Sequence, residues 1–162
     1  MTDTPPRDPA PDAHLSTVDA LAQLSFTVHG LLERRAGEHG ISITQTRLLG
    51  VLRDREPTMR ELTLLLELDK SSVSGLVDRA ERRGLVVRAR SASDGRAVQV
   101  RLTADGRALV REVAERFDSD VEQLLAHLST PERYALSGLV SRMLVGEAQA
   151  RGIELFPDER AH

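Results

Sequence analysis

The residues best suited to binding chemistry are arginines concentrated between residues 79 and 101. This stretch has only two acids, Glu81 and Asp94, although the whole chain has a net charge of −3. Its arginines are Arg79, Arg82, Arg83, Arg88, Arg90, Arg96 and Arg101. Guanidinium groups stay charged and form paired hydrogen bonds with phosphate oxygens. Such a basic stripe is typical of a surface that contacts a polyanion, although a solvated surface in an arginine-rich protein has the same composition.

Short polar residues lie just before and within the start of this stretch. An apolar i, i+3, i+4, i+7 pattern predicts a helix over about residues 70–83, which Gly84 ends. Its buried side is formed by Val73, Leu76, Val77 and Ala80. The opposite side carries Lys70, Ser71, Ser72, Ser74, Gly75, Asp78 and Arg79. Short hydroxyls allow close approach to a DNA duplex and can bond phosphates or base edges, and amides at a helix start favour phosphate.

Gly75 is out of place in the middle of a helix, where it costs about 1 kcal/mol relative to alanine. Two interpretations stay open. The glycine either permits close backbone approach to DNA or is a small residue that the helix tolerates.

A β-hairpin is predicted directly after this helix. Leu85, Val86 and Val87 begin one strand, and the alternation over residues 98–102 predicts the second. Its candidate DNA contacts are Arg88, Arg90, Ser91, Asp94 and Arg96. A hairpin beside a DNA-reading helix can insert arginine into the minor groove. We expect Asp94 to orient Arg96 or Arg79.

A shorter helix precedes the reading helix. Thr58 and Glu61 form a capping-box pattern, and a tight connection at Leu68 and Asp69 leads to the next helix. Residues 58–102 therefore read as helix, turn, helix and basic hairpin. We expect Thr58 and Arg60 to contact the DNA backbone.

Longer helices flank this unit on both sides. Ser16 caps a predicted helix that runs to about Glu38, Thr44 is the predicted cap of the next helix, and Thr103 that of a long one. A final helix restarts at the Ser129-Thr130-Pro131-Glu132 segment.

The expected fold class is mainly α with a small β-hairpin wing. We expect a winged helix-turn-helix DNA-binding region over residues 41–102 and a helical dimerisation region over residues 16–40 and 103–150. Residues 1–15, which are rich in proline, and residues 151–162 are expected to be tails.

Composition excludes several other classes of protein. The chain has 162 residues, no cysteine, and 2% aromatic residues, so the core must be aliphatic and thiol chemistry is excluded. Neither a membrane span nor a secretory signal is visible, which makes the cytoplasm the expected location. Because we find no phosphate loop, nucleophile elbow or metal-ligand spacing, we expect no enzyme activity, no cofactor and no metal site.

Several segments together resemble the MarR family (multiple antibiotic resistance regulators). They are Lys70-Ser71-Ser72-Val73-Ser74, Leu76-Val77-Asp78-Arg79, Arg83-Gly84-Leu85-Val86, Arg88, Asp94-Gly95-Arg96-Ala97-Val98, Val100, Leu102-Thr103 and Gly106. The Asp-x-Arg wing followed by Leu-Thr-x-x-Gly is the most specific part. Gly75 and Ala80 depart from the family pattern, which has larger residues there.

The resemblance implies a homodimer that regulates transcription from a palindromic operator in double-stranded DNA. We expect a repressor, and the sequence leaves an activator as the alternative because both bind DNA identically. It also implies release by a small, frequently phenolic, effector, for which the sequence assigns no residues. The alternative is a helical protein-interaction module of the same fold that does not bind DNA, against which the arginine stripe argues.

Overall fold

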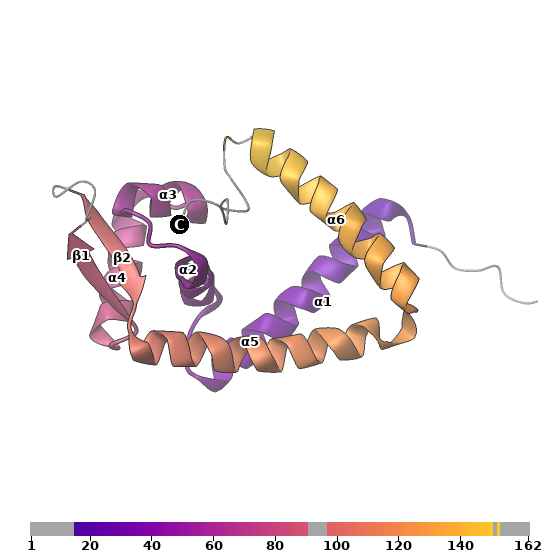
Figure 1. Cartoon of the computed structure of the whole chain (residues 1–162), viewed down its shortest axis with the longest axis horizontal. Coiled ribbons are helices and arrows are strands. Elements are labelled where there is room, and N and C mark those ends of the chain that lie inside the picture. The colour runs from indigo at the N-terminus through magenta and orange to yellow at the C-terminus, as the bar shows by residue number, and fades with distance from the viewer. Residues whose placement is uncertain (1–14, 91–96, 151, 153–162) are drawn as a thin grey trace, which may run out of the picture.

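The fold joins a small helix-and-hairpin unit to three long helices. The computed structural model describes residues 15–90, 97–150 and 152. The helices are α1 (Thr17–Glu38), α2 (Ile43–Asp54), α3 (Met59–Leu66), α4 (Lys70–Arg82), α5 (Ala104–Leu124) and α6 (Thr130–Ala150), with a 3-10 turn η1 (Leu125–His127) after α5. Figure 1 shows α2, α3, α4 and the hairpin clustered at one end of α5, while α1 crosses α5 and α6 follows its other end. The predicted mainly helical fold with a two-stranded wing is confirmed.

The hairpin consists of β1 (Val86–Arg90) and β2 (Val98–Leu102), paired antiparallel. Val86 lies opposite Leu102, and Arg90 lies opposite Val98. The predicted turn at residues 91–95 lies outside the described residues.

Hydroxyl caps place the helix starts. The caps predicted at Ser16, Thr58 and Thr103 are confirmed, each accepting a backbone amide three residues on. The prediction that Thr44 caps α2 is wrong, because Ser42 is the cap and shares a capping box with Gln45. Three residues after Ser42 stands a glutamine that reaches back to the Ser42 amide at 3.0 Å, and no such partner follows Thr44.

The aliphatic core lies within the helix-and-hairpin unit. Its most completely buried large side chains are Leu48, Leu62, Leu66, Leu76, Val73, Val77, Val86 and Val100. They come from α2, α3, α4 and both strands, so each of these elements is held by the others. The apolar residues that gave the helices their 3.6-residue period and the strands their alternation are therefore packed together in one core.

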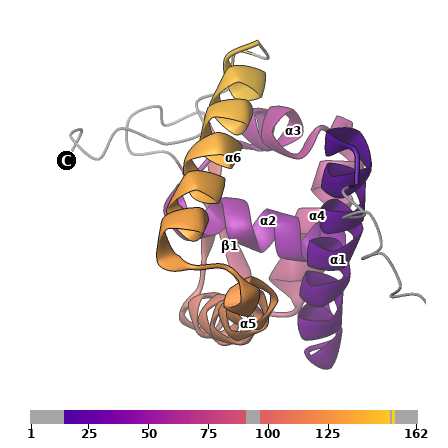
Figure 2. The same cartoon turned by 90° about the vertical axis from the view of Figure 1, so that its right-hand side faces the viewer.

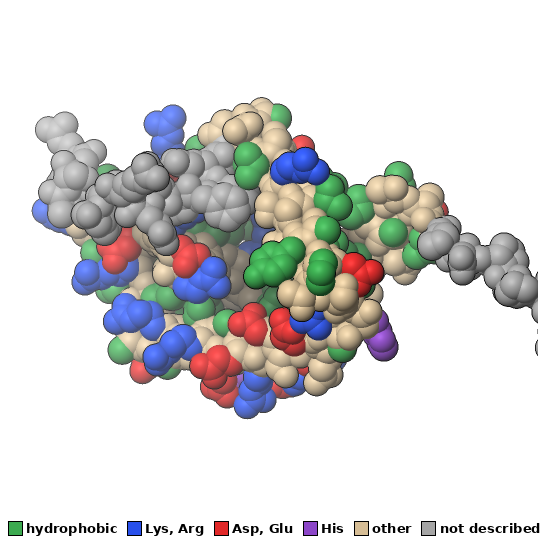
Figure 3. All heavy atoms as spheres, turned by 45° about the vertical axis from the view of Figure 1, so that its right-hand side comes forward, with side chains coloured by type: hydrophobic (Ala, Val, Ile, Leu, Met, Phe, Trp, Pro, Cys, Tyr) green, Lys and Arg blue, Asp and Glu red, His purple; other side chains and the backbone are tan. Residues whose placement is uncertain are grey.

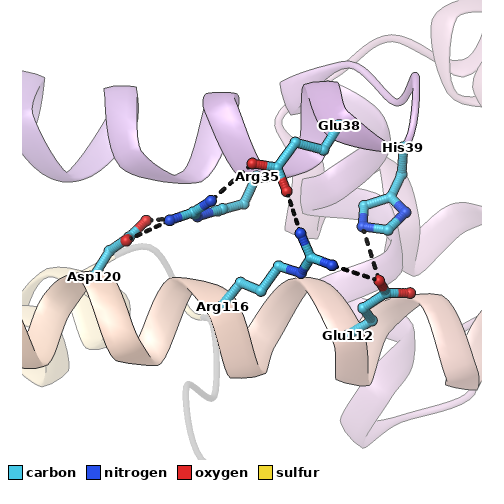
Figure 4. Close-up of polar contacts among 6 residues, drawn as sticks. All are labelled: Arg35, Glu38, His39, Glu112, Arg116 and Asp120. Atoms are coloured by element: carbon cyan, nitrogen blue, oxygen red, sulfur yellow. Dashed lines mark hydrogen bonds and ion pairs between the residues drawn. The ribbon is translucent and has the colours of Figure 1, made fainter.

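One continuous ion-pair network attaches α1 to α5, because Arg35 also bonds Glu38 at 2.7 Å (Figure 4). Arg35 of α1 donates from Nε and Nη2 to the two carboxylate oxygens of Asp120, at 2.8 and 2.7 Å. This guanidinium, with its hydrogen bonds, lowers the pKa of Asp120 below its usual range. One turn away, Arg116 of α5 bonds Glu38 at 2.8 Å and Glu112 at 3.1 Å. The end of α1 is therefore fixed on α5 by charge as well as by packing.

Helix α6 is not packed along another helix of the described chain. It overlaps α1 in Figure 1 but stands apart from it in Figure 2. Several large apolar side chains of these two helices are exposed: Val18, Phe26, Tyr134, Leu139, Met143 and Leu144. Figure 3 shows hydrophobic side chains gathered on this part of the surface. Across the described residues, no helix combines the length and apolarity needed to cross a bilayer.

Gly106, in the first turn of α5, is buried where this helix meets the hairpin. A Cβ atom added to Gly106 would lie 2.0 Å from the carbonyl oxygen of Leu85. Around it, the Thr103 amide donates to that same oxygen at 3.0 Å, and the Thr103 hydroxyl donates to the Gly84 carbonyl at 2.6 Å. Only glycine leaves room for this junction.

We expect Gly106→Ala to destabilise the protein by about 3 kcal/mol, because the clash is with backbone and cannot be relieved by a side-chain rotation. Thermal or urea unfolding followed by circular dichroism measures this. Gly138→Ala is the matched control, since a Cβ there meets nothing within 4 Å. Equal stability of the two variants would contradict the close contact.

Candidate nucleic-acid interface

Helix α4 presents the predicted division between a buried and an exposed side. Val73, Leu76, Val77 and Ala80 are buried at 1% exposure or less. On the other side, Lys70, Ser71, Ser72, Asp78 and Arg79 are exposed, and Ser74 and Gly75 are partly exposed. The structure therefore brings the predicted recognition-helix residues together on one accessible surface.

Asp69, predicted from the sequence only as part of a turn, is the N-cap of α4. Its Oδ1 accepts the backbone amides of Ser71 and Ser72, both at 2.9 Å. These hydrogen bonds, together with those from the two serine hydroxyls, hold the pKa of Asp69 well below its usual range. The sequence predicts that the amides at this helix start favour phosphate. In the structure, the Asp69 carboxylate already accepts hydrogen bonds from two of them.

Gly75 lies against the side chain of Arg79, one helical turn further on. A Cβ at position 75 would be 3.4 Å from Arg79 Nη1. The guanidinium thus rests over the bare backbone of Gly75, where a larger side chain would compete for the space. This contact gives Gly75 a local role, and close approach of its backbone to DNA stays a prediction.

Arg88 of β1 is turned toward α4 and not away from the protein. It donates from Nη2 to Asp78 at 2.5 Å and from Nη1 to Glu81, and its backbone amide also donates to Glu81 at 3.3 Å. Its side chain is 26% exposed. Arg88 therefore links the wing to the recognition helix, and Asp78 is its partner.

The remaining candidate DNA contacts differ in exposure and in hydrogen bonding. Arg90 is exposed at the end of β1, and Arg60 is exposed on α3. The Thr58 hydroxyl is engaged in the capping box, accepting from the Glu61 amide at 3.2 Å and donating to its carboxylate at 2.8 Å. Ser91, Asp94 and Arg96 lie outside the described residues.

Arg83, at the end of α4, has a role that sequence reasoning missed. Its Nη1 donates to the Gly40 carbonyl at 2.6 Å and its Nη2 to the His39 carbonyl at 2.9 Å. Gly40 has a φ of 63°, the left-handed conformation that favours glycine. The α1–α2 turn is thus held by the recognition helix. The glycine signalled a turn, but no local pattern indicated its partner, which lies over 40 residues away.

A cavity of about 310 Å³ lies between α1, α2 and α5. Its wall is mostly apolar, including Leu32, Ile41, Leu49, Val113 and Phe117, with Thr46, Arg47, Arg53 and Asp118 as polar members. This size and lining are typical of a site for a small organic ligand.

Comparison with known proteins agrees with this geometry. The family model described as "MarR family" matches residues 39–97. An uncharacterized HTH-type transcriptional regulator of Bacillus subtilis, YdgJ, is 30% identical over 105 residues, which are 64% of this chain and 64% of that protein.

Two solved structures share the fold. The Staphylococcus aureus MepR–DNA complex is similar over 82% of this chain and 99% of that chain, with a TM-score of 0.65 and 23% identity. NadR in complex with 4-hydroxyphenylacetate is similar over 84% and 97%, with a TM-score of 0.66 and 24% identity.

Arg88 and Arg90 lie two residues apart on the same strand, and so they form a matched pair for testing the wing. We expect Arg90→Ala to reduce the slope of log affinity against log salt by about one unit, as loss of one phosphate contact does. Arg88→Ala should leave that slope unchanged and lower the free energy of unfolding by about 1 kcal/mol, because it removes a partly exposed ion-pair link.

The measurements are DNA binding by fluorescence anisotropy at several salt concentrations and urea unfolding. A flattened slope for Arg88→Ala would assign that residue to phosphate contact instead.

Proposed function

Because this chain belongs to the MarR family of winged helix-turn-helix transcriptional regulators, we propose that it is a homodimeric repressor that binds a palindromic operator in double-stranded DNA. The family consists of regulators and not of enzymes, so the prediction of a non-enzymatic protein is confirmed. The observation that carries the proposal is the exposed polar side of α4 beside the arginine-bearing hairpin. This activity implies a location in the cytoplasm, on the nucleoid.

The contacts of each side chain indicate whether it reads bases, contacts the DNA backbone or supports the surface. The exposed side of α4 has the shape and polarity to enter the major groove, with Ser71, Ser72, Ser74 and Arg79 reading bases. Arg90, and Arg96 beyond the described residues, supply affinity that does not depend on sequence. Arg88 and Asp78 support this surface by holding the wing against the helix.

A second copy of the chain is the expected partner of the exposed apolar residues of α1 and α6. Tyr134 is 77% exposed and Met143 is 54% exposed. Large apolar side chains exposed in this number on two neighbouring parts of the surface mark an interface. The two-fold axis of such a dimer would place two α4 helices on one side of a duplex. Half-site centres about 10 base pairs apart, or a multiple of that, satisfy this geometry.

Selection from a random duplex library at moderate salt tests the proposal. We expect the full chain to enrich an inverted repeat and to sediment at about twice 17.8 kDa. Leu139→Glu, which puts a charge on the exposed apolar side of α6, should give a folded monomer that no longer enriches the repeat.

Ser141→Glu is the matched control, because it adds the same charge at an exposed polar position of α6. It should stay dimeric and bind normally. Failure of the unmodified chain to enrich any sequence, with no salt-dependent binding to any duplex, would favour the protein-interaction module. A non-palindromic consensus would reject the dimeric reader.

We further propose that a small aromatic acid releases the protein from DNA by occupying the cavity between α1, α2 and α5. The cavity wall joins the end of α1 to α2 and α5, so a bound ligand would contact elements from both parts of the molecule. Ile41 in this wall follows directly on the turn that Arg83 holds. The 4-hydroxyphenylacetate complex of NadR, a protein of the same fold, supports this class of effector.

The probe for this proposal is 4-hydroxyphenylacetate at millimolar concentration. We expect it to weaken operator binding by about tenfold. Ala114→Phe, which fills the cavity from α5, should abolish the response without changing affinity in the absence of the compound. Ala108→Phe, an exposed position of the same helix outside the cavity wall, should respond like the unmodified chain. An unaltered operator affinity in all three proteins would reject this effector class.

A further inference from the structure

Asp69 determines in which direction the serine hydroxyls at the start of α4 donate their protons. Besides the two backbone amides, the Asp69 carboxylate accepts both neighbouring serine hydroxyls. The Ser71 Oγ lies 2.5 Å from Oδ1, and the Ser72 Oγ lies 2.6 Å from Oδ2. Each oxygen of the carboxylate therefore holds one hydroxyl.

An ionised carboxylate has no proton to donate, so the proton in each of these two bonds belongs to the serine. The low pKa of Asp69 keeps the group ionised at neutral pH. A serine hydroxyl has one proton and two lone pairs. With both protons directed at Asp69, Ser71 and Ser72 present lone pairs to their surroundings.

We infer that Asp69 is a specificity-determining residue that makes the start of α4 select bases with an exocyclic amino group in the major groove. This inference rests on the proposed function. In the major groove, adenine N6 and cytosine N4 are donors, whereas guanine and thymine present acceptors. The two serines accept from adenine or cytosine and disfavour guanine and thymine.

The same polarity separates these serines from phosphate contacts. Phosphate oxygens are acceptors, and neither hydroxyl has a free proton while Asp69 is charged. The negative charge of Asp69 adds repulsion. Ser71 and Ser72 therefore contribute to sequence preference and not to general affinity, which the exposed arginines supply.

Asp69→Asn reverses the polarity of one serine while keeping the cap, since asparagine caps helices as well as aspartate does. The amide oxygen replaces Oδ1, which accepts both backbone amides, so the amide nitrogen replaces Oδ2. That nitrogen donates to Ser72 Oγ and turns the Ser72 proton outward. Ser71 keeps its acceptor and its polarity.

The experiment is selection from a random duplex library with the full chain, Asp69→Asn and Ser72→Ala, and with unfolding curves for each. We expect Ser72→Ala to lose base preference at one position of each half-site. At that same position the unmodified chain should prefer adenine or cytosine, and Asp69→Asn should prefer guanine or thymine, by about tenfold each. All other positions should be unchanged.

Guanine or thymine at that position in the unmodified chain's consensus would overturn the inference. An unchanged preference in Asp69→Asn would also overturn it, as would a Ser72→Ala variant with the full original preference. If Asp69→Asn fails to fold, the unmodified chain and Ser72→Ala decide the question alone. Absence of any consensus from the unmodified chain would instead reject the proposed function.

Discussion

The rest of the structure depends on one close backbone contact. It lies between the first turn of α5 and Leu85, just before the hairpin. Gly106 lies so close to the Leu85 carbonyl that no side chain fits between them. The same carbonyl accepts the Thr103 amide, and the Thr103 hydroxyl bonds Gly84 directly after α4. One small junction therefore fixes the end of α4, the start of the hairpin and the direction of α5. Because α5 leads on toward α6 and packs against α1, this junction sets where the proposed DNA-reading surface lies relative to these two helices.

Acidic residues organise the basic surface around this junction. Asp69 orients the hydroxyls at the start of α4, while Asp78 and Glu81 hold Arg88 of the wing. In an interface that contacts phosphate, unpaired acids would repel the ligand. Here Asp78 and Glu81 are paired with Arg88, so their charges hold the wing in place. Asp69 is bonded only by neutral groups and keeps its charge at the start of α4. Arginines that look equivalent in the sequence consequently divide into two groups, those that hold the fold, such as Arg83 and Arg88, and those left exposed, such as Arg90.

The sequence predicted helices, strands and caps correctly where the local pattern allowed only one interpretation. The apolar spacing of α4, the alternation of β2 and the Thr58–Glu61 capping box each corresponded to the observed element. The start of α2 was misplaced because two hydroxyl residues, Ser42 and Thr44, compete within three positions. The glutamine at position 45 distinguishes them. The side-chain partners of Arg83 and Arg88 could not be predicted, because they depend on packing between elements distant in the sequence.

The ion-pair network between α1 and α5 is also linked to α4. Arg83 holds the carbonyls of His39 and Gly40, and the His39 ring lies 3.8 Å from Glu112 of α5 (Figure 4). Glu112 in turn bonds Arg116, which bonds Glu38 at the end of α1. Helix α4 is thus connected through the α1–α2 turn to α1 and α5, two of the three helices that wall the cavity. A change in the angle between α1 and α5 would have to break or rearrange these bonds, and the carbonyls that Arg83 holds would move with it. An effector of the proposed kind would therefore need no contact with α4 to act on the proposed DNA-reading surface.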